Sequence, residues 1–109
     1  MLWLDLVAWF FGGACLANAV PHVVSGMMGR PFQSPFARPP GKGLSSSTVN
    51  VVWGSANIVI GYGLIWHVGA FTFAEVSDAA ALGAGALLIA LFSARHFGRF
   101  HGGTMSERQ

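Results

Sequence analysis

Charged residues divide this chain into three long uncharged runs, at residues 6–29, 43–74 and 79–94. A helix needs about 20 mostly apolar residues to cross the hydrocarbon core of a bilayer, and the first two runs exceed that length. The third run is shorter, but Arg95 at its end can extend its charged head to the interface. We therefore expect three membrane-spanning helices, at about residues 3–28, 48–71 and 78–97.

The spans are expected to be helices because the sequence shows no alternation of polar and apolar residues, which the strands of a membrane barrel require. The segments VNVVWGSANIVIGYGLIW and AALGAGALLIALF both lack this period of two. Only 9% of the residues are charged, against about a quarter in soluble domains. The predicted fold class is an all-α integral membrane protein, with a single membrane-embedded domain over residues 1–109.

The basic residues predict the orientation of this bundle. With three spans, the loop after the first helix and the segment after the third lie on the same side of the membrane. Every Lys and Arg falls on that side, and basic residues near helix ends favour the cytoplasm. We expect the N-terminus outside, the C-terminus inside, and a bacterial inner membrane as the location. The basic residues are Arg30, Arg38, Lys42, Arg95, Arg99 and Arg108.

The first apolar stretch has one feature of a secretory signal, since LANA, ending at Ala19, has the form of a cleavage site. The residues before it contain Asp5 and no Lys or Arg, whereas a signal peptide begins with basic residues. We expect this stretch to remain as the first span. It contains the single cysteine, Cys15, so no disulfide can form within the chain.

The loop between the first two helices is rich in proline, with four prolines in residues 31–40. They exclude a helix and favour an extended or turning backbone. Two phenylalanines lie here between basic residues, a mixture that suits the interface of a leaflet with anionic lipid. We expect a long cytoplasmic loop that contacts lipid or a partner, or a plain connector whose phenylalanines enter the headgroups. The contact residues would be Arg30, Phe32, Phe36, Arg38 and Lys42.

Polar residues of all three predicted helices fall in the cytoplasmic half of the membrane. Such side chains must face protein, water or one another, which makes the group a candidate binding site. The alternative is that the asparagines only hydrogen-bond across the helix pair. Pro21 could open the backbone near the group by freeing a carbonyl. The candidate residues are Asn18, His22, Asn50, Asn57, Ser93 and His96.

Two of these residues, His22 and His96, lie at similar depth on different helices, as the two axial ligands of a haem would. The sequence has no Cys-x-x-Cys-His or His-x-x-x-His motif, and no carboxylate lies at that depth to complete a metal site. We therefore expect no cofactor and no metal. A nucleic-acid partner is not expected either, because the basic residues are explained by topology and form no stripe.

Small residues recur at helical spacing in each predicted span, which lets membrane helices approach closely. The predicted third helix is unusually rich in them, so we expect it to contact a second copy or another membrane protein. The alternative is that these contacts are all used within one chain. The predicted packing residues are Gly13, Ala17, Gly54, Gly61, Ala86, Ala90 and Ala94.

Two patches, AVPH at residues 19–22 and LIWHVG at residues 64–69, together with the topology, resemble the SemiSWEET half-transporters of bacteria. The resemblance implies a homodimeric carrier of small solutes with alternating access and an outside N-terminus. In that family a glutamine follows the proline, where this chain has His22. The first loop here is also longer, and the third helix has no polar residue near its middle.

The sequence contains no pair of nucleophile and base and no paired carboxylates in the spans, so enzymatic function is not indicated. The first interpretation is a non-enzymatic membrane component, an oligomeric accessory or assembly factor that binds lipid or a partner. The alternative is the SemiSWEET-like carrier, with the polar group as its site. A third interpretation is a membrane enzyme in which His22 acts as acid or base on a lipid.

Overall fold

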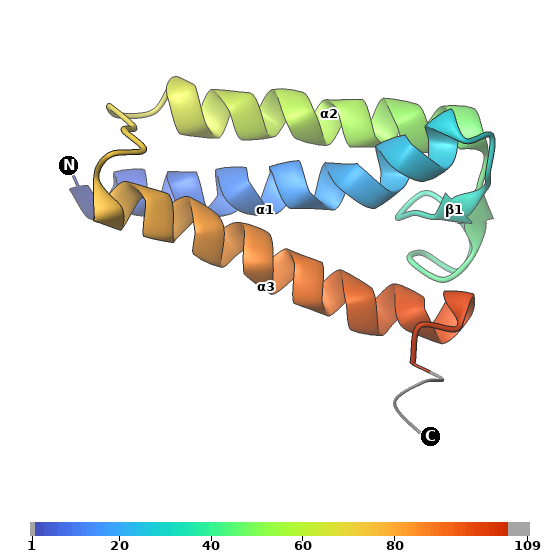
Figure 1. Cartoon of the computed structure of the whole chain (residues 1–109). Coiled ribbons are helices and arrows are strands. Elements are labelled where there is room, and N and C mark those ends of the chain that lie inside the picture. The colour runs from blue at the N-terminus through green and yellow to red at the C-terminus, as the bar shows by residue number, and fades with distance from the viewer. Residues whose placement is uncertain (1, 105–109) are drawn as a thin grey trace.

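Three long helices and one short hairpin make up the chain in the computed structural model, which describes residues 2–104 (Figure 1). Each helix is long and apolar enough to cross a membrane, which confirms the predicted number and type of spans. At about 1.5 Å per residue, even the shortest helix extends about 30 Å, the thickness of a hydrocarbon core. The elements are α1 (Leu2–Met27), β1 (Phe32–Gln33), β2 (Leu44–Ser45), α2 (Ser47–Trp66) and α3 (Val76–His101).

Helix α1 packs along both of the other helices, with α2 on one side and α3 on the other (Figure 1). Helix α3 diverges from α1 toward its C-terminal end, where the segment that carries β1 lies beside the bundle. We call this end, formed by residues 27–47 and the last turns of α3, the loop end. The opposite end holds the N-terminus and the connection at residues 67–75.

The boundaries of α2 differ from the prediction of 48–71, because the helix ends at Trp66. The next residues turn at Gly69, whose φ of 61° belongs to the left-handed region that favours glycine. There the indole Nε1 of Trp9 donates to the Val68 carbonyl at 2.9 Å, so α1 provides a hydrogen-bond donor for a backbone group outside the helix. At its start, α2 is capped as its serine-rich sequence favours, since Ser46 Oγ accepts from the Val49 amide at 3.2 Å.

The other two helices also differ at their ends. Helix α3 is longer than the predicted 78–97, because it stays helical until Gly102, where a φ of 79° stops it. Helix α1, predicted at 3–28, ends one residue earlier and continues through Pro21 without a break.

The glycines among the predicted packing residues lie where two helices approach each other closely. Gly54 and Gly61 of α2 lie against the backbone of α1, and Gly13 of α1 lies against the backbone of α3. The glycine Gly85, which the sequence did not single out, lies against the Phe10 carbonyl of α1. The alanines of α3 are different: Ala86 is half-buried, whereas the side chains further along are exposed. These exposed residues are Ala90 and Ala94, which line an open groove with Ala17.

We expect the Gly85→Ala substitution to destabilise the bundle by about 1–3 kcal/mol, the usual cost of overpacking. A methyl group there would overlap the Phe10 carbonyl oxygen, which belongs to the backbone and cannot rotate away. Gly83→Ala is the matched control, because no atom of another helix lies within 4 Å of its added carbon. Reversible unfolding of both variants in mixed micelles measures the difference. Equal stability of the two would contradict the close approach of α1 and α3.

Candidate functional site at the loop end

The loop between α1 and α2 is folded into a defined structure at residues 28–46, which we call the cap. Strands β1 and β2 pair antiparallel, with Phe32 opposite Ser45 and Gln33 opposite Leu44. Inside this hairpin, the Ser34 and Ser45 hydroxyls hydrogen-bond at 2.5 Å, and the Gly41 amide donates to the Ser34 carbonyl at 2.8 Å. The extended and turning backbone was expected from the prolines, but the pairing of the two short strands was not.

The side chain of Asn50, in the first turns of α2, joins the cap to two helices. Its Nδ2 donates to the carbonyls of Phe32 (3.2 Å), Ser45 (3.2 Å) and Ser46 (3.0 Å). Its Oδ1 lies 2.7 Å from Nδ1 of His22 on α1, and since the amide oxygen can only accept, His22 Nδ1 is the donor. Asn50 is fully buried at 0% exposure. One amide therefore ties α1, both strands of the cap and the start of α2 together.

A second polar pair lies further along the same two helices. Nδ2 of Asn18 donates to Oδ1 of Asn57 at 3.2 Å, and Nδ2 of Asn57 donates to the carbonyl of Trp53 at 2.9 Å. This is the cross-helix bond between asparagines that the sequence offered as an alternative to a binding site. It satisfies polar groups that would otherwise face the membrane interior without a partner.

The six residues of the predicted polar cluster do not converge on one site. The four on α1 and α2 form the two pairs described above, so their side chains face each other. Ser93 of α3 lines the open groove beside α1, and the His96 ring is turned to the cap, where it bonds the Gly41 carbonyl at 2.7 Å. The prediction considered only the position of each residue along its helix, whereas the direction in which each side chain points separates them.

Histidines of α3 hold the cap from the other side. Nε2 of His96 donates to the Gly41 carbonyl, and Nε2 of His101 lies 2.7 Å from the Gln33 side-chain oxygen. The His101 ring also stacks on Phe32, with ring centres 5.0 Å apart and planes 9° from parallel. The cap is therefore hydrogen-bonded to α2 through Asn50 and to α3 through His96 and His101, which contact it on different sides.

The predicted loop contacts divide into one buried and four exposed residues. Phe32, expected at the lipid interface, is only 8% exposed, because it packs between His22, Phe97 and His101. This corrects its assignment as a lipid contact: the aromatic ring helps to hold the cap in place. Phe36 is 64% exposed. The three basic residues are exposed as well: Arg30, Arg38 and Lys42.

The two histidines considered for haem are not arranged as axial ligands. The Phe97 ring packs against both, with its centre 6.1 Å from that of His22 and 5.0 Å from that of His96. Nε2 of His96 is also engaged by the cap. Within residues 2–104, no group of three or more His, Cys, Asp or Glu side chains is placed to hold a metal ion.

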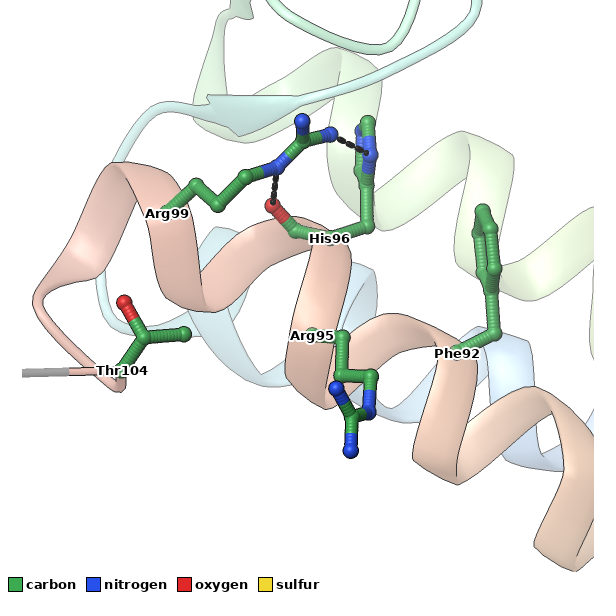
Figure 2. Close-up of a pocket in the computed structure, with 5 residues that line it drawn as sticks. All are labelled: Phe92, Arg95, His96, Arg99 and Thr104. Carbon is green, nitrogen blue, oxygen red and sulfur yellow. Dashed lines mark hydrogen bonds between the residues drawn. The ribbon is translucent and has the colours of Figure 1, made fainter. Parts of the chain in front are cut away.

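A pocket of about 350 Å³ lies at the end of α3, and sequence reasoning had not proposed it as a site (Figure 2). The available signal was the spacing of two arginines four residues apart, which places them on one side of a helix. We call this cavity the basic pocket. Its lining residues are Phe92, Arg95, His96, Arg99 and Thr104.

Charge is strongly separated along the bundle. The basic residues that the structure describes all belong to the cap or the last two turns of α3, whereas Arg108 lies outside the described residues. The three described acidic residues lie at the opposite end: Asp5 in the first turn of α1, Glu75 immediately before α3 as its N-cap residue, and Asp78 in the first turn of α3. The described part of the loop end therefore carries cations without neighbouring carboxylates.

Comparison of the chain with known protein families, with characterised proteins and with solved structures found no match. The SemiSWEET resemblance therefore gains no support beyond the two short patches and the topology. The role of the loop end has to be inferred from its own residues.

We expect Asn50→Ala to release the cap, because it leaves the Phe32 and Ser45 carbonyls and the His22 ring without their partner. Each buried polar group left unpaired costs about 1–3 kcal/mol. Amides of the cap, such as those of Gly41 and Gly43, should then exchange with deuterium much faster. Asn18→Ala is the control, since it removes one cross-helix bond, typically worth about 0.6 kcal/mol. If the cap amides exchange with deuterium at the same rate in both variants, Asn50 does not hold the cap.

Proposed function

We propose that this chain is a non-enzymatic membrane component that presents a rigid cationic cap at one membrane face, where it binds anionic lipid or the acidic surface of a partner. The observation that carries this proposal is the separation of charge: the described cations gather at the loop end and the described carboxylates at the other. Uncompensated cations at a membrane face attract anionic headgroups, each by about 1 kcal/mol.

The anchoring of the cap supports a binding role for it. A flexible loop loses conformational entropy when it binds, whereas a loop already ordered by its own protein avoids most of that cost. The cap is held by Asn50, His96 and His101, and yet its cationic side chains and Phe36 remain exposed. The structure thus combines a fixed backbone with free charged groups.

We propose that the loop end faces the cytoplasm of a bacterial cell and the N-terminus lies outside. The support for this orientation is the bias of Lys and Arg toward the cytoplasmic ends of spans. In that orientation, the cationic cap meets the leaflet whose anionic lipids give the membrane a negative surface potential.

We further propose that the protein acts as an oligomer, with itself or with another membrane protein. The support is the open groove of about 400 Å³ between α1 and α3, where Ala90 and Ala94 are exposed. Small residues on an open helix face permit the close approach of another helix. The carrier alternative would need the polar side chains free for a solute, and in this structure Asn18, Asn57 and His22 bond to protein groups instead.

The proposed orientation predicts which loop reacts with a membrane-impermeant maleimide on intact cells. In a Cys15→Ala background, Ala74→Cys in the connection before α3 should be labelled, and Pro40→Cys in the cap should not. Both positions are exposed, so both should react once the membrane is opened. Labelling of Pro40→Cys alone on intact cells would reverse the orientation.

The proposed function predicts the outcome of native mass spectrometry after mild solubilisation. We expect the chain to retain anionic phospholipid or another polypeptide, and the triple variant Arg30→Gln, Arg38→Gln and Lys42→Gln to retain fewer of these molecules than the unmodified chain. Asn18→Ala, which removes no charge, should behave as the unmodified chain. A homodimer that holds a polar small molecule, lost in Asn18→Ala and kept in the triple variant, would favour the carrier.

A further inference from the structure

The guanidinium of Arg99 in the basic pocket is held in one direction by its neighbour on α3. Its Nη2 lies 2.8 Å from Nδ1 of His96, and its Nε makes a longer contact of 3.5 Å with the His96 carbonyl. Figure 2 shows the side chain curled back toward the His96 ring by these two contacts. Within residues 2–104, the remaining N–H groups, on Nη1 and the far side of Nη2, have no acceptor and can bind a ligand.

The partners of His96 define its tautomer. Its Nε2 faces the Gly41 carbonyl, which can only accept, so Nε2 carries the hydrogen. Its Nδ1 faces the Arg99 guanidinium, which can only donate, so Nδ1 is the acceptor. The ring is therefore neutral, and it is fixed further by stacking on Phe92 with centres 5.5 Å apart. His96 thus transmits the position of the cap to Arg99.

Two other groups border the same pocket. Arg95 is exposed one helical turn before Arg99, and Figure 2 shows its side chain extended away from His96 and from the Arg99 guanidinium. Because the Arg95 side chain is exposed, it can turn toward a ligand that Arg99 holds, and this rotation is part of the proposal. Thr104 is brought back to α3 by the left-handed turn at Gly102, where the Gly103 amide bonds the Gly98 carbonyl at 2.9 Å. Its hydroxyl can donate to an oxyanion that two guanidinium groups attract.

The surface of α3 toward the membrane interior is apolar directly below these groups. Leu88, Leu91 and Phe92 are all exposed there, between 57% and 60%. A ligand that combines an oxyanion with hydrocarbon chains fits this arrangement, with its charge at the arginines and its chains along the helix. A small soluble anion would contact only the arginines and not the apolar surface of α3.

We propose that the basic pocket binds the phosphate group of one anionic phospholipid, with Arg99 and Arg95 as its cationic ligands and His96 as the residue that positions Arg99. This assignment rests on the proposed function and makes it specific, since it places a defined lipid site on α3 in addition to the diffuse attraction of the cap. Arginine suits this role because its planar fork matches the oxygens of a phosphate.

Native mass spectrometry of the delipidated full chain tests the site. Phosphatidylglycerol, phosphatidylcholine with the same acyl chains, and inorganic phosphate are titrated separately. We expect one phosphatidylglycerol to bind at least tenfold more tightly than phosphatidylcholine, and the variant Arg95→Gln/Arg99→Gln to lose this preference. The matched control is Arg30→Gln/Arg38→Gln, which removes the same charge from the cap and should keep the tight first binding.

The positioning role of His96 has its own readout. His96→Leu should weaken phosphatidylglycerol binding several-fold in the unmodified chain and have no further effect when Arg99→Gln is already present. A merely structural role of His96 would weaken binding in both backgrounds to the same extent, and this result would overturn the positioning role.

The remaining outcomes separate this inference from the proposed function. If the cap variant lowers affinity as much as the α3 variant, the attraction is diffuse: the defined site fails and the cationic cap stands. If neither variant changes lipid binding, both fail. Equal affinity for the two phospholipids would also overturn the site, and displacement of phosphatidylglycerol by low millimolar inorganic phosphate would assign the pocket to a soluble anion instead.

Discussion

The side-chain amide of Asn50 is the constraint on which the loop end depends. At the end of a membrane-spanning bundle, a chain that leaves one helix and enters the next exposes backbone carbonyls where water is scarce, and each needs a donor. Asn50 serves three such carbonyls with the two hydrogens of one amide, so at least one hydrogen is shared. Its oxygen is used as well, by His22. Because the group is fully buried, the loss of any partner would leave a polar atom without compensation.

The effect of this one residue extends to the far side of the bundle. The bonds of Asn50 hold both strands of the cap, and the hairpin between them places the Gly41 carbonyl where His96 can reach it. The His96 ring, held through Nε2, offers Nδ1 to Arg99. A chain of direct contacts therefore leads from the start of α2, through the cap, to a cation near the end of α3, although α2 and α3 both pack mainly on α1. A change in the cap would therefore alter the position of the Arg99 guanidinium, because His96 contacts both groups and its two partners fix its tautomer.

Much of the helical framework could be read from the sequence, and most of the loop end could not. Uncharged runs predict spans because the bilayer imposes a minimum length, and the three helices follow these runs. The end of α2 was placed too late because the residues after Trp66 remain apolar while the backbone turns at Gly69. The polar residues were predicted to lie at one depth, but the rotation of each helix decides which side chain each one contacts, and hydropathy contains no such information. Phe32 was misassigned because an aromatic residue near Arg30 is typical of an interface anchor. Its burial depends on a hairpin that pairs residues at least eleven positions apart in the sequence.

The arrangement of polar groups also bears on which kind of membrane protein this is. A carrier exposes its intramembrane polar groups to solute in at least one state, so their hydrogen bonds must be exchanged easily. Here the pairs Asn18–Asn57 and His22–Asn50 serve internal needs, and opening the second would also release the cap. Within residues 2–104, the charged groups exposed at the loop end are different ones: the cations of the cap and of α3. A chain that uses its interior polarity to fix a loop and leaves the described cations of the loop end exposed supports the proposed contact at a membrane face, and this is the physical reason to look for its ligands among headgroups and neighbouring proteins.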